Sequence, residues 1–150
     1  MCIRDSAYEV PEELKEKIQS LFWAGCCGDD ETKQTIGRVW QEHHYLCDTH
    51  TAVAWNVAQQ YKAANPAHAP VVVLSTASPY KFPAAVLGGL GEKAEGDEFA
   101  VMEQLERLTR IPAPKNLRGL RERPVRHTTV LDREEMLPFV LEKAQEKKWF

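Results

Sequence analysis

Hydrophobic positions recur at helical spacing over most of the chain. Residues 11–23 begin with a proline near the first turn and place Leu14, Ile18 and Leu21 on one helical face. Short polar or glycine-containing segments separate this stretch from others with the same periodicity. The pattern predicts further helices that begin at Asp29 or Asp30, after a cap at Asp48, and over residues 82–90, 97–107 and 133–147.

One segment has the composition of a buried strand. Residues 71–74 are three valines and a leucine, a β-branched run typical of a strand that is buried on both faces of a parallel sheet. Residues 127–131 are a weaker second strand, and residues 111–126 are rich in proline and arginine and predict irregular surface. We therefore expect an α/β fold that is helix-rich and has few strands of its own. The loop at residues 75–83 leaves the first strand at its carboxyl end, where open α/β sheets bind ligands.

Two strands are too few for a sheet that is stable by itself, since about three are the usual minimum. The remaining strands are thus expected in a part of the protein outside this sequence. Residues 1–6 lack the apolar core and cleavage site of a signal peptide. The codons that encode them resemble a transposon end used in shotgun sequencing. We expect residues 1–6 to be translated adapter, the alternative being a short natural terminus.

Charge and composition exclude several classes of protein. The chain is 43% hydrophobic and 27% charged, which is the range of globular domains. Its formal net charge of −3 has no basic excess, so we expect no nucleic-acid partner. No apolar run approaches the roughly 20 residues of a membrane helix, so we expect no membrane span. Four cysteines without a disulfide-like spacing favour the cytoplasm.

Two motifs carry the candidate chemistry. Residues 48–54 read Asp-Thr-His-Thr-Ala-Val-Ala, and residues 74–83 read Leu-Ser-Thr-Ala-Ser-Pro-Tyr-Lys-Phe-Pro. In order and separation they resemble the D-P-H-T-A-V and L-S-T-A-(H/S)-P-x-K-F-P motifs of threonine synthases. The helices that precede them resemble the same family, and the resemblance covers roughly residues 8–145. Thr49 replaces the proline of the family motif, and Ala54 stands where glycine is frequent.

The resemblance implies that residues 7–150 are the C-terminal part of the catalytic region of a fold-type-II enzyme dependent on pyridoxal 5'-phosphate (PLP). It implies a lyase of threonine biosynthesis, which converts O-phospho-L-homoserine and water to L-threonine and phosphate. The family's Schiff-base lysine and glycine-rich cofactor loop lie upstream, so this sequence contains no catalytic residue of that kind. We expect the chain to be inactive alone and to need the missing N-terminal part of its own chain as partner.

The resemblance also gives candidate cofactor-binding residues. Thr76 would supply a hydroxyl to the pyridine nitrogen of PLP, since a neutral hydroxyl can donate a hydrogen bond to an unprotonated ring nitrogen. Ser75 is the nearest competitor for this role. The alternative is structural: both hydroxyls would only satisfy backbone groups at the end of a strand.

Two further residues are expected near the site without contacting the reacting atoms. Lys81 is not the Schiff-base lysine of the family, and we expect it in a structural ion pair or at the site entrance, or simply in solvent. His50 lies in the first turn of its predicted helix. It would approach the site or cap and pack, and we favour packing.

Other functions are compatible with parts of the sequence. Another fold-type-II lyase, such as a threonine dehydratase, would share the ring-nitrogen hydroxyl but not normally both motifs. A stand-alone helical interaction module would use the basic residues 118–126 as a partner surface. A zinc site is the weakest alternative, because the spacing of its possible ligands matches no common pattern; these ligands are His43, His44, Cys47 and His50.

Cys26 and Cys27 are adjacent and do not form a C-x-x-C redox motif. We expect both to be ordinary buried cysteines.

Overall fold

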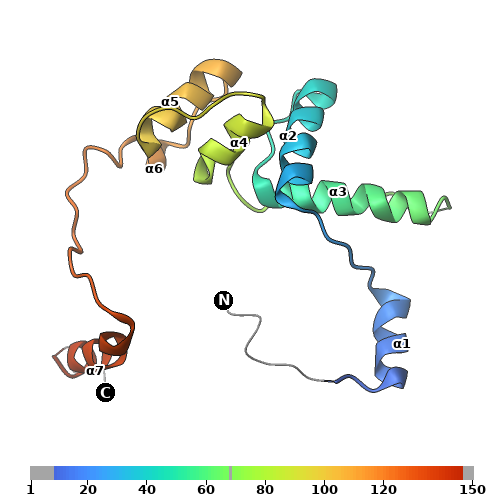
Figure 1. The fold of residues 1–150 in the computed structure, drawn as a ribbon, viewed down its shortest axis with the longest axis horizontal. Coiled ribbons are helices and arrows are strands. Elements are labelled where there is room, and N and C mark those ends of the chain that lie inside the picture. The colour runs from blue at the N-terminus through green and yellow to red at the C-terminus, as the bar shows by residue number, and fades with distance from the viewer. Residues whose placement is uncertain (1–8, 68, 147–150) are drawn as a thin grey trace. The chain divides into compact units, whose positions relative to one another are not determined.

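The computed structural model describes residues 9–67 and 69–146, and Figure 1 shows how their elements follow one another. Contacts divide the chain into two units between Arg118 and Gly119. The predicted adapter at residues 1–6 lies outside the described residues. The first unit contains α1 (Glu12–Leu21), α2 (Asp29–His43), α3 (Thr49–Ala64), η1 (Pro79–Lys81), α4 (Pro83–Gly89), α5 (Glu98–Thr109) and α6 (Lys115–Arg118); the second contains η2 (Arg133–Glu135) and α7 (Met136–Glu146).

The long helices begin and end at residues suited to helix termini. Asp48 caps α3 and Asp97 caps α5 through their carboxylates. α2 begins at Asp29, as predicted; its cap is Gly28, and the Glu31 carboxylate accepts the Gly28 N–H at 2.8 Å. All predicted helices are thus confirmed, with α6 as one additional turn in the region predicted to be irregular.

The core of the first unit lies where α2 packs against α3 and α4, and where α4 packs against α5. α1 contributes nothing to it, because none of its residues is buried. Apolar side chains from the helices and from the loops between them fill this core: Ile36, Val39, Leu46, Cys47, Ala52, Tyr80, Val86, Leu87, Val101, Leu105 and Ala113.

Two glycines allow α2 and α4 to approach closely. A Cβ atom added to Gly37 would lie 2.5 Å from the carbonyl oxygen of Gly89, which is far inside van der Waals contact. A Cβ atom added to Gly89 would lie 2.8 Å from Cβ of Ile36. Neither clash involves the end of a flexible side chain. The backbones of the two helices are therefore in direct contact at this crossing.

The predicted strands are wrong for the residues that the structure describes. Residues 71–74 and 127–131 form no regular element and have no strand partner within residues 9–67 and 69–146. Several of their apolar side chains are uncovered, with Val72 81% and Val130 91% exposed. The α/β expectation is therefore corrected to a helical one. A β-branched run forms a strand only when a second strand pairs with it.

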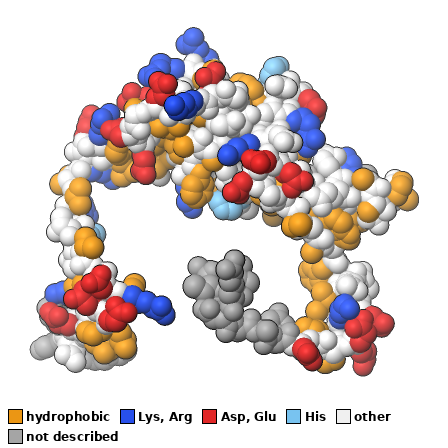
Figure 2. All heavy atoms as spheres, in the orientation of Figure 1, with side chains coloured by type: hydrophobic (Ala, Val, Ile, Leu, Met, Phe, Trp, Pro, Cys, Tyr) orange, Lys and Arg blue, Asp and Glu red, His pale blue; other side chains and the backbone are white. Residues whose placement is uncertain are grey.

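The second unit is described by itself. Asp132 N–H donates to the Glu135 carboxylate at 2.9 Å and so starts η2, which continues directly into α7. Hydrophobic side chains on α7 are exposed, namely Met136, Leu137, Val140 and Leu141. Figure 2 shows hydrophobic side chains in orange beside charged ones at this end of the chain. None of the described helices combines the length and the apolar character needed to cross a bilayer.

Candidate functional site

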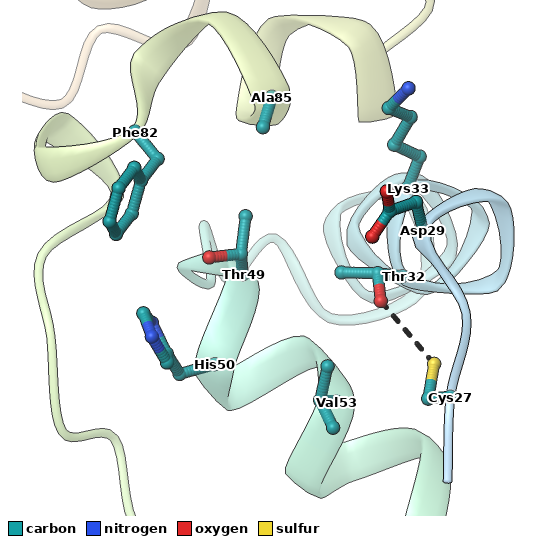
Figure 3. A pocket seen from close by; sticks show the side chains of 9 residues that line it. All are labelled: Cys27, Asp29, Thr32, Lys33, Thr49, His50, Val53, Phe82 and Ala85. Carbon is teal, nitrogen blue, oxygen red and sulfur yellow. Dashed lines mark hydrogen bonds between the residues drawn. The ribbon is translucent and has the colours of Figure 1, made fainter. Parts of the chain in front are cut away.

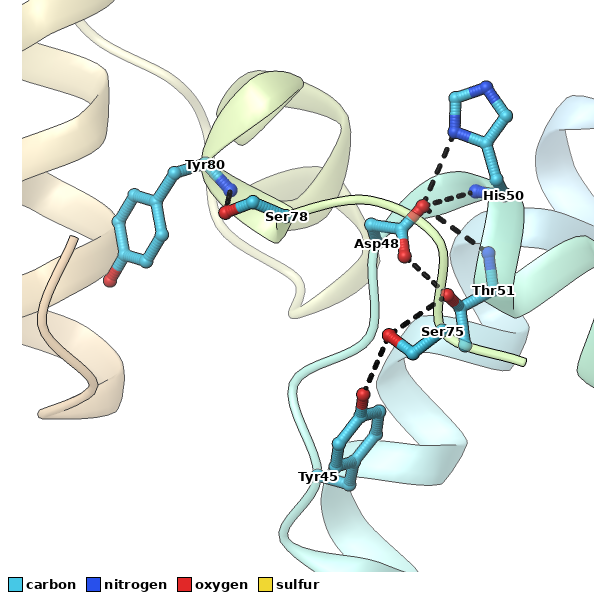
Figure 4. A network of polar contacts seen from close by, with 7 residues as sticks. All are labelled: Tyr45, Asp48, His50, Thr51, Ser75, Ser78 and Tyr80. Carbon is cyan, nitrogen blue, oxygen red and sulfur yellow. Dashed lines mark hydrogen bonds and ion pairs between the residues drawn. The ribbon is translucent and has the colours of Figure 1, made fainter. Parts of the chain in front are cut away.

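Asp48 organises the start of α3 (Figure 4). Its carboxylate is 1% exposed and accepts hydrogen bonds from the backbone N–H of His50 at 2.9 Å and of Thr51 at 3.3 Å. The Thr51 hydroxyl donates to the second carboxylate oxygen, and Nδ1 of His50 lies 3.3 Å from the first. One buried side chain thus satisfies two of the free amides of the helix N-terminus and fixes two motif residues.

The ionisation of Asp48 follows from these contacts. Burial alone would raise the pKa of Asp48, because it disfavours the charged carboxylate. Hydrogen bonds from the Thr51 hydroxyl and from the Thr51 and His50 amides stabilise the charged form and outweigh burial. The pKa of Asp48 is therefore lowered from its ordinary value, and the group is a carboxylate at neutral pH.

A chain of hydroxyl groups connects Asp48 to the loop that carries the second motif. Tyr45 donates its phenol proton to Oγ of Ser75 at 2.9 Å. Oγ1 of Thr51 and Oγ of Ser75 are 3.4 Å apart. Because the single hydroxyl proton of Thr51 is used by Asp48, the longer contact between Thr51 and Ser75 is weak. Tyr45, Ser75, Thr51 and Asp48 thus form a continuous row of polar contacts.

The other end of this loop is fixed by Ser78 and Tyr80. Oγ of Ser78 accepts the Tyr80 N–H at 3.3 Å and so caps η1. The Tyr80 ring is 3% exposed, and its hydroxyl donates to the carbonyl of Ile111. Burial raises the pKa of Tyr80, so the phenol keeps its proton for this bond. Thr76 and Ala77 therefore lie between two anchored points.

Both candidate cofactor residues, Ser75 and Thr76, are exposed. Ser75 accepts a hydrogen bond from Tyr45. Thr76 makes no hydrogen bond to any residue within the described ranges, so its hydroxyl is available to a group from outside them.

A pocket of about 530 Å³ lies beside the same helix terminus (Figure 3). This volume is in the range of small-molecule sites. Charged, hydroxyl and apolar side chains all face it from the starts of α2, α3 and α4: Cys27, Asp29, Thr32, Lys33, Thr49, His50, Val53, Phe82 and Ala85. Such a lining suits a small polar molecule with an apolar part.

His50 and Lys81 meet at Phe82. The His50 ring packs against the Phe82 ring with a centroid separation of 5.7 Å, and it also lines the pocket. Nζ of Lys81 lies 5.9 Å from the centroid of the same Phe82 ring, a cation–π contact. The packing role favoured for His50 is thus observed, and its approach to the cofactor site stays a prediction. An ion pair of Lys81 is not found with the residues that the structure describes.

The described cysteines differ in environment. Cys26 is exposed, which corrects the expectation that it is buried, and Cys27 is half-buried. The Thr32 hydroxyl donates to the Gly28 carbonyl at 2.8 Å, so the Cys27 thiol is the donor to Thr32 at 3.4 Å. Cys47 is buried, and burial raises the pKa of this thiol to about 11.

The described residues contain no group of three or more His, Cys, Asp or Glu side chains that could hold a metal ion. The residues considered for zinc have other roles. His43 packs on Trp55 at a ring separation of 5.4 Å, and His50 contacts Asp48 and Phe82.

Together these features define a helical module in which an anchored loop displays the exposed hydroxyl of Thr76, and in which the starts of α2, α3 and α4 line a pocket. A family model described as "Threonine synthase, C-terminal" matches residues 51–140. The chain belongs to the threonine synthase family and corresponds to its C-terminal region.

Individual relatives agree with this assignment. Threonine synthase-like 2 of Homo sapiens is 33% identical over 107 residues, which are 71% of this chain and 22% of that protein. Threonine synthase-like 1 of Mus musculus is 36% identical over 80 residues, 53% of this chain and 10% of that protein. Threonine synthase of Pseudomonas aeruginosa is 32% identical over 84 residues, 55% of this chain and 18% of that protein. The chain thus spans about a fifth or less of the length of these relatives.

Proposed function

We propose that this chain is the C-terminal part of a PLP-dependent lyase of fold type II that converts O-phospho-L-homoserine and water to L-threonine and phosphate. The observation that carries the proposal is the exposed hydroxyl of Thr76 in the second motif, inside the region that matches the family. In this proposal the lysine that binds the cofactor covalently lies in a part of the parent protein outside this sequence.

The residues of this chain fit one side of a PLP site. A hydroxyl group that no described residue uses is a suitable partner for a neutral pyridine nitrogen. When bound, PLP supplies an electron sink for proton removal beside the amino group of the substrate. A hydroxyl partner leaves the ring nitrogen unprotonated, whereas a carboxylate would favour its protonated form. The share of this chain in catalysis is therefore to hold and orient the ring.

The exposed apolar segments support the view that this chain completes a larger fold. Val72 and Leu74 are 81% and 72% exposed directly before the motif that carries Thr76. Such a β-branched run would be covered by pairing with strands of the parent protein. The compartment we propose is the cytoplasm, since Cys26, Cys27 and Cys47 are free thiols.

The test begins with recovery of the upstream coding sequence and expression of the complete parent protein. Phosphate release and threonine formation from O-phospho-L-homoserine are then measured with PLP present. We expect both products in equal amounts, and neither from residues 1–150 alone. A complete protein that folds and binds PLP but releases no phosphate would refute the reaction. A reading frame that begins at Met1, with cooperative folding of the 150 residues, would favour a stand-alone interaction module instead.

A further inference from the structure

The Thr76 hydroxyl can serve a ligand only if the backbone that carries it has a fixed place. Thr76 follows a segment without a strand partner among the described residues, so within this chain its place depends on other contacts. Catalytic groups must be held to within about 0.5 Å of their working geometry. Contacts of the loop itself can contribute to this order.

The hydroxyl chain provides such contacts at Ser75. Ser75 accepts from Tyr45 at 2.9 Å, and its Oγ also lies 3.4 Å from Oγ1 of Thr51. Ser75 is therefore engaged by two side chains, whereas Thr76 makes no hydrogen bond to any described residue.

The far end of the chain of hydroxyls is rigid. Asp48 is buried and its carboxylate is held by three donors from α3, so it cannot turn away from Thr51. Tyr45 lies in the segment between α2 and α3, only three residues before Asp48. The contacts on Ser75 thus all come from one connected stretch, residues 45–51, at the start of α3.

We propose that Tyr45, Thr51 and Asp48 are positioning residues, which act through Ser75 to fix the point where Thr76 presents its hydroxyl. This inference rests on the proposed function, because it gives the fixed hydroxyl a cofactor to meet. It assigns different roles to the two neighbouring hydroxyls: Ser75 orients the backbone, and Thr76 contacts the ring.

The first test uses this chain and needs no cofactor. Order parameters from ¹⁵N relaxation are measured for the backbone of residues 75–78 in Tyr45→Phe and Ser75→Ala. Tyr61→Phe and Ser20→Ala are the matched controls, since Tyr61 contacts Trp23 and the Ser20 hydroxyl bonds within α1. We expect the value at Thr76 to fall toward the ~0.6 of flexible backbone in the first pair only. Unchanged values in both test variants would overturn the proposal.

The second test uses the complete parent protein with PLP. Loss of one hydrogen bond should weaken PLP binding by about threefold to tenfold in Tyr45→Phe and Ser75→Ala, with the cofactor absorption maximum unchanged. Thr76→Ala should shift that maximum, and Thr76→Ser should restore it. If Ser75→Ala shifts the maximum and Thr76→Ala does not, the two roles are reversed and the proposal fails.

These outcomes are separable from failure of the proposed reaction. The order parameters and the absorption maximum report on the loop and the ring, whichever substrate the enzyme uses. A parent protein that shows the expected spectral pattern but releases no phosphate would refute the reaction and support the positioning roles.

Discussion

Replacing Asp48 by alanine removes the acceptor on which the start of α3 depends. Loss of a helix N-cap costs about 0.5–2 kcal/mol. The same change leaves the Thr51 hydroxyl without its acceptor, and Thr51 is 4% exposed. An unsatisfied buried polar group costs about 1–3 kcal/mol. The two contributions overlap, so we expect Asp48→Ala to lower the free energy of unfolding by about 2–4 kcal/mol at pH 7.

The effect should depend on pH in one direction. The pKa of Asp48 is lower in the folded chain than its ordinary value of 3.8. The unfolded chain therefore takes up the proton first as pH falls. The contribution of the charge is complete above the ordinary value and is lost as pH falls through the folded pKa. Asp48→Asn keeps a good helix cap but removes the charge. The difference in the free energy of unfolding between wild type and Asp48→Asn should therefore shrink as pH falls from the ordinary pKa through the folded pKa.

Urea denaturation followed by circular dichroism measures these differences, at pH 7 and at several values below 4. Asp97→Ala is the matched control, because Asp97 caps α5 by accepting the Ala100 N–H at 2.8 Å and, unlike Asp48, is exposed. It should cost about 1 kcal/mol. If Asp48→Ala lowers the free energy of unfolding no more than Asp97→Ala does, the reasoning is refuted. It is also refuted if the difference in this free energy between wild type and Asp48→Asn does not change with pH.

Further predictions concern single residues at helix contacts and in the core. Gly37→Ala should destabilise the chain by about 1–3 kcal/mol in the same assay, because its Cβ would overlap a backbone carbonyl. Gly88→Ala, whose Cβ would meet only the Lys33 side chain at 3.9 Å, should be neutral or stabilising by up to ~1 kcal/mol. At pH 8, iodoacetamide with peptide mass spectrometry should label Cys26 and spare Cys47; the stabilisation from the raised Cys47 pKa should be lost as pH rises from 9.0 to about 11. Tyr80→Phe should cost about 1–3 kcal/mol on urea denaturation, since it leaves a carbonyl unpaired.

The helices could be predicted because their signals are local. The spacing of Leu14, Ile18 and Leu21 and the cap at Asp48 act within one or two turns, so neither depends on distant residues. The predicted strand at residues 71–74 failed for the opposite reason. Pairing depends on a second strand, and none lies among the described residues. Composition alone cannot report whether a partner is near.

The candidate site could be predicted only in part. The motif favoured Thr76 over Ser75 as the partner of the ring nitrogen, and that assignment stays a prediction, whereas the contacts of Ser75 came only from the structure. Tyr45 was missed because it reaches Ser75 across 30 residues, a separation that no periodicity reports. The capping role of Asp48 was predictable from its place before a helix. The contact that links Asp48 to Ser75 through Thr51 was not predictable, because it joins residues 24 positions apart.

The crossing of α2 and α4 at Gly37 and Gly89 has a mechanical consequence for the pocket of Figure 3. Where two backbones touch without intervening side chains, neither rotamer changes nor small slides can absorb a displacement. The walls of the pocket that belong to α2 and α4 should thus keep a constant separation. The third wall carries Thr49, His50 and Val53 on α3, the helix whose start is capped by Asp48.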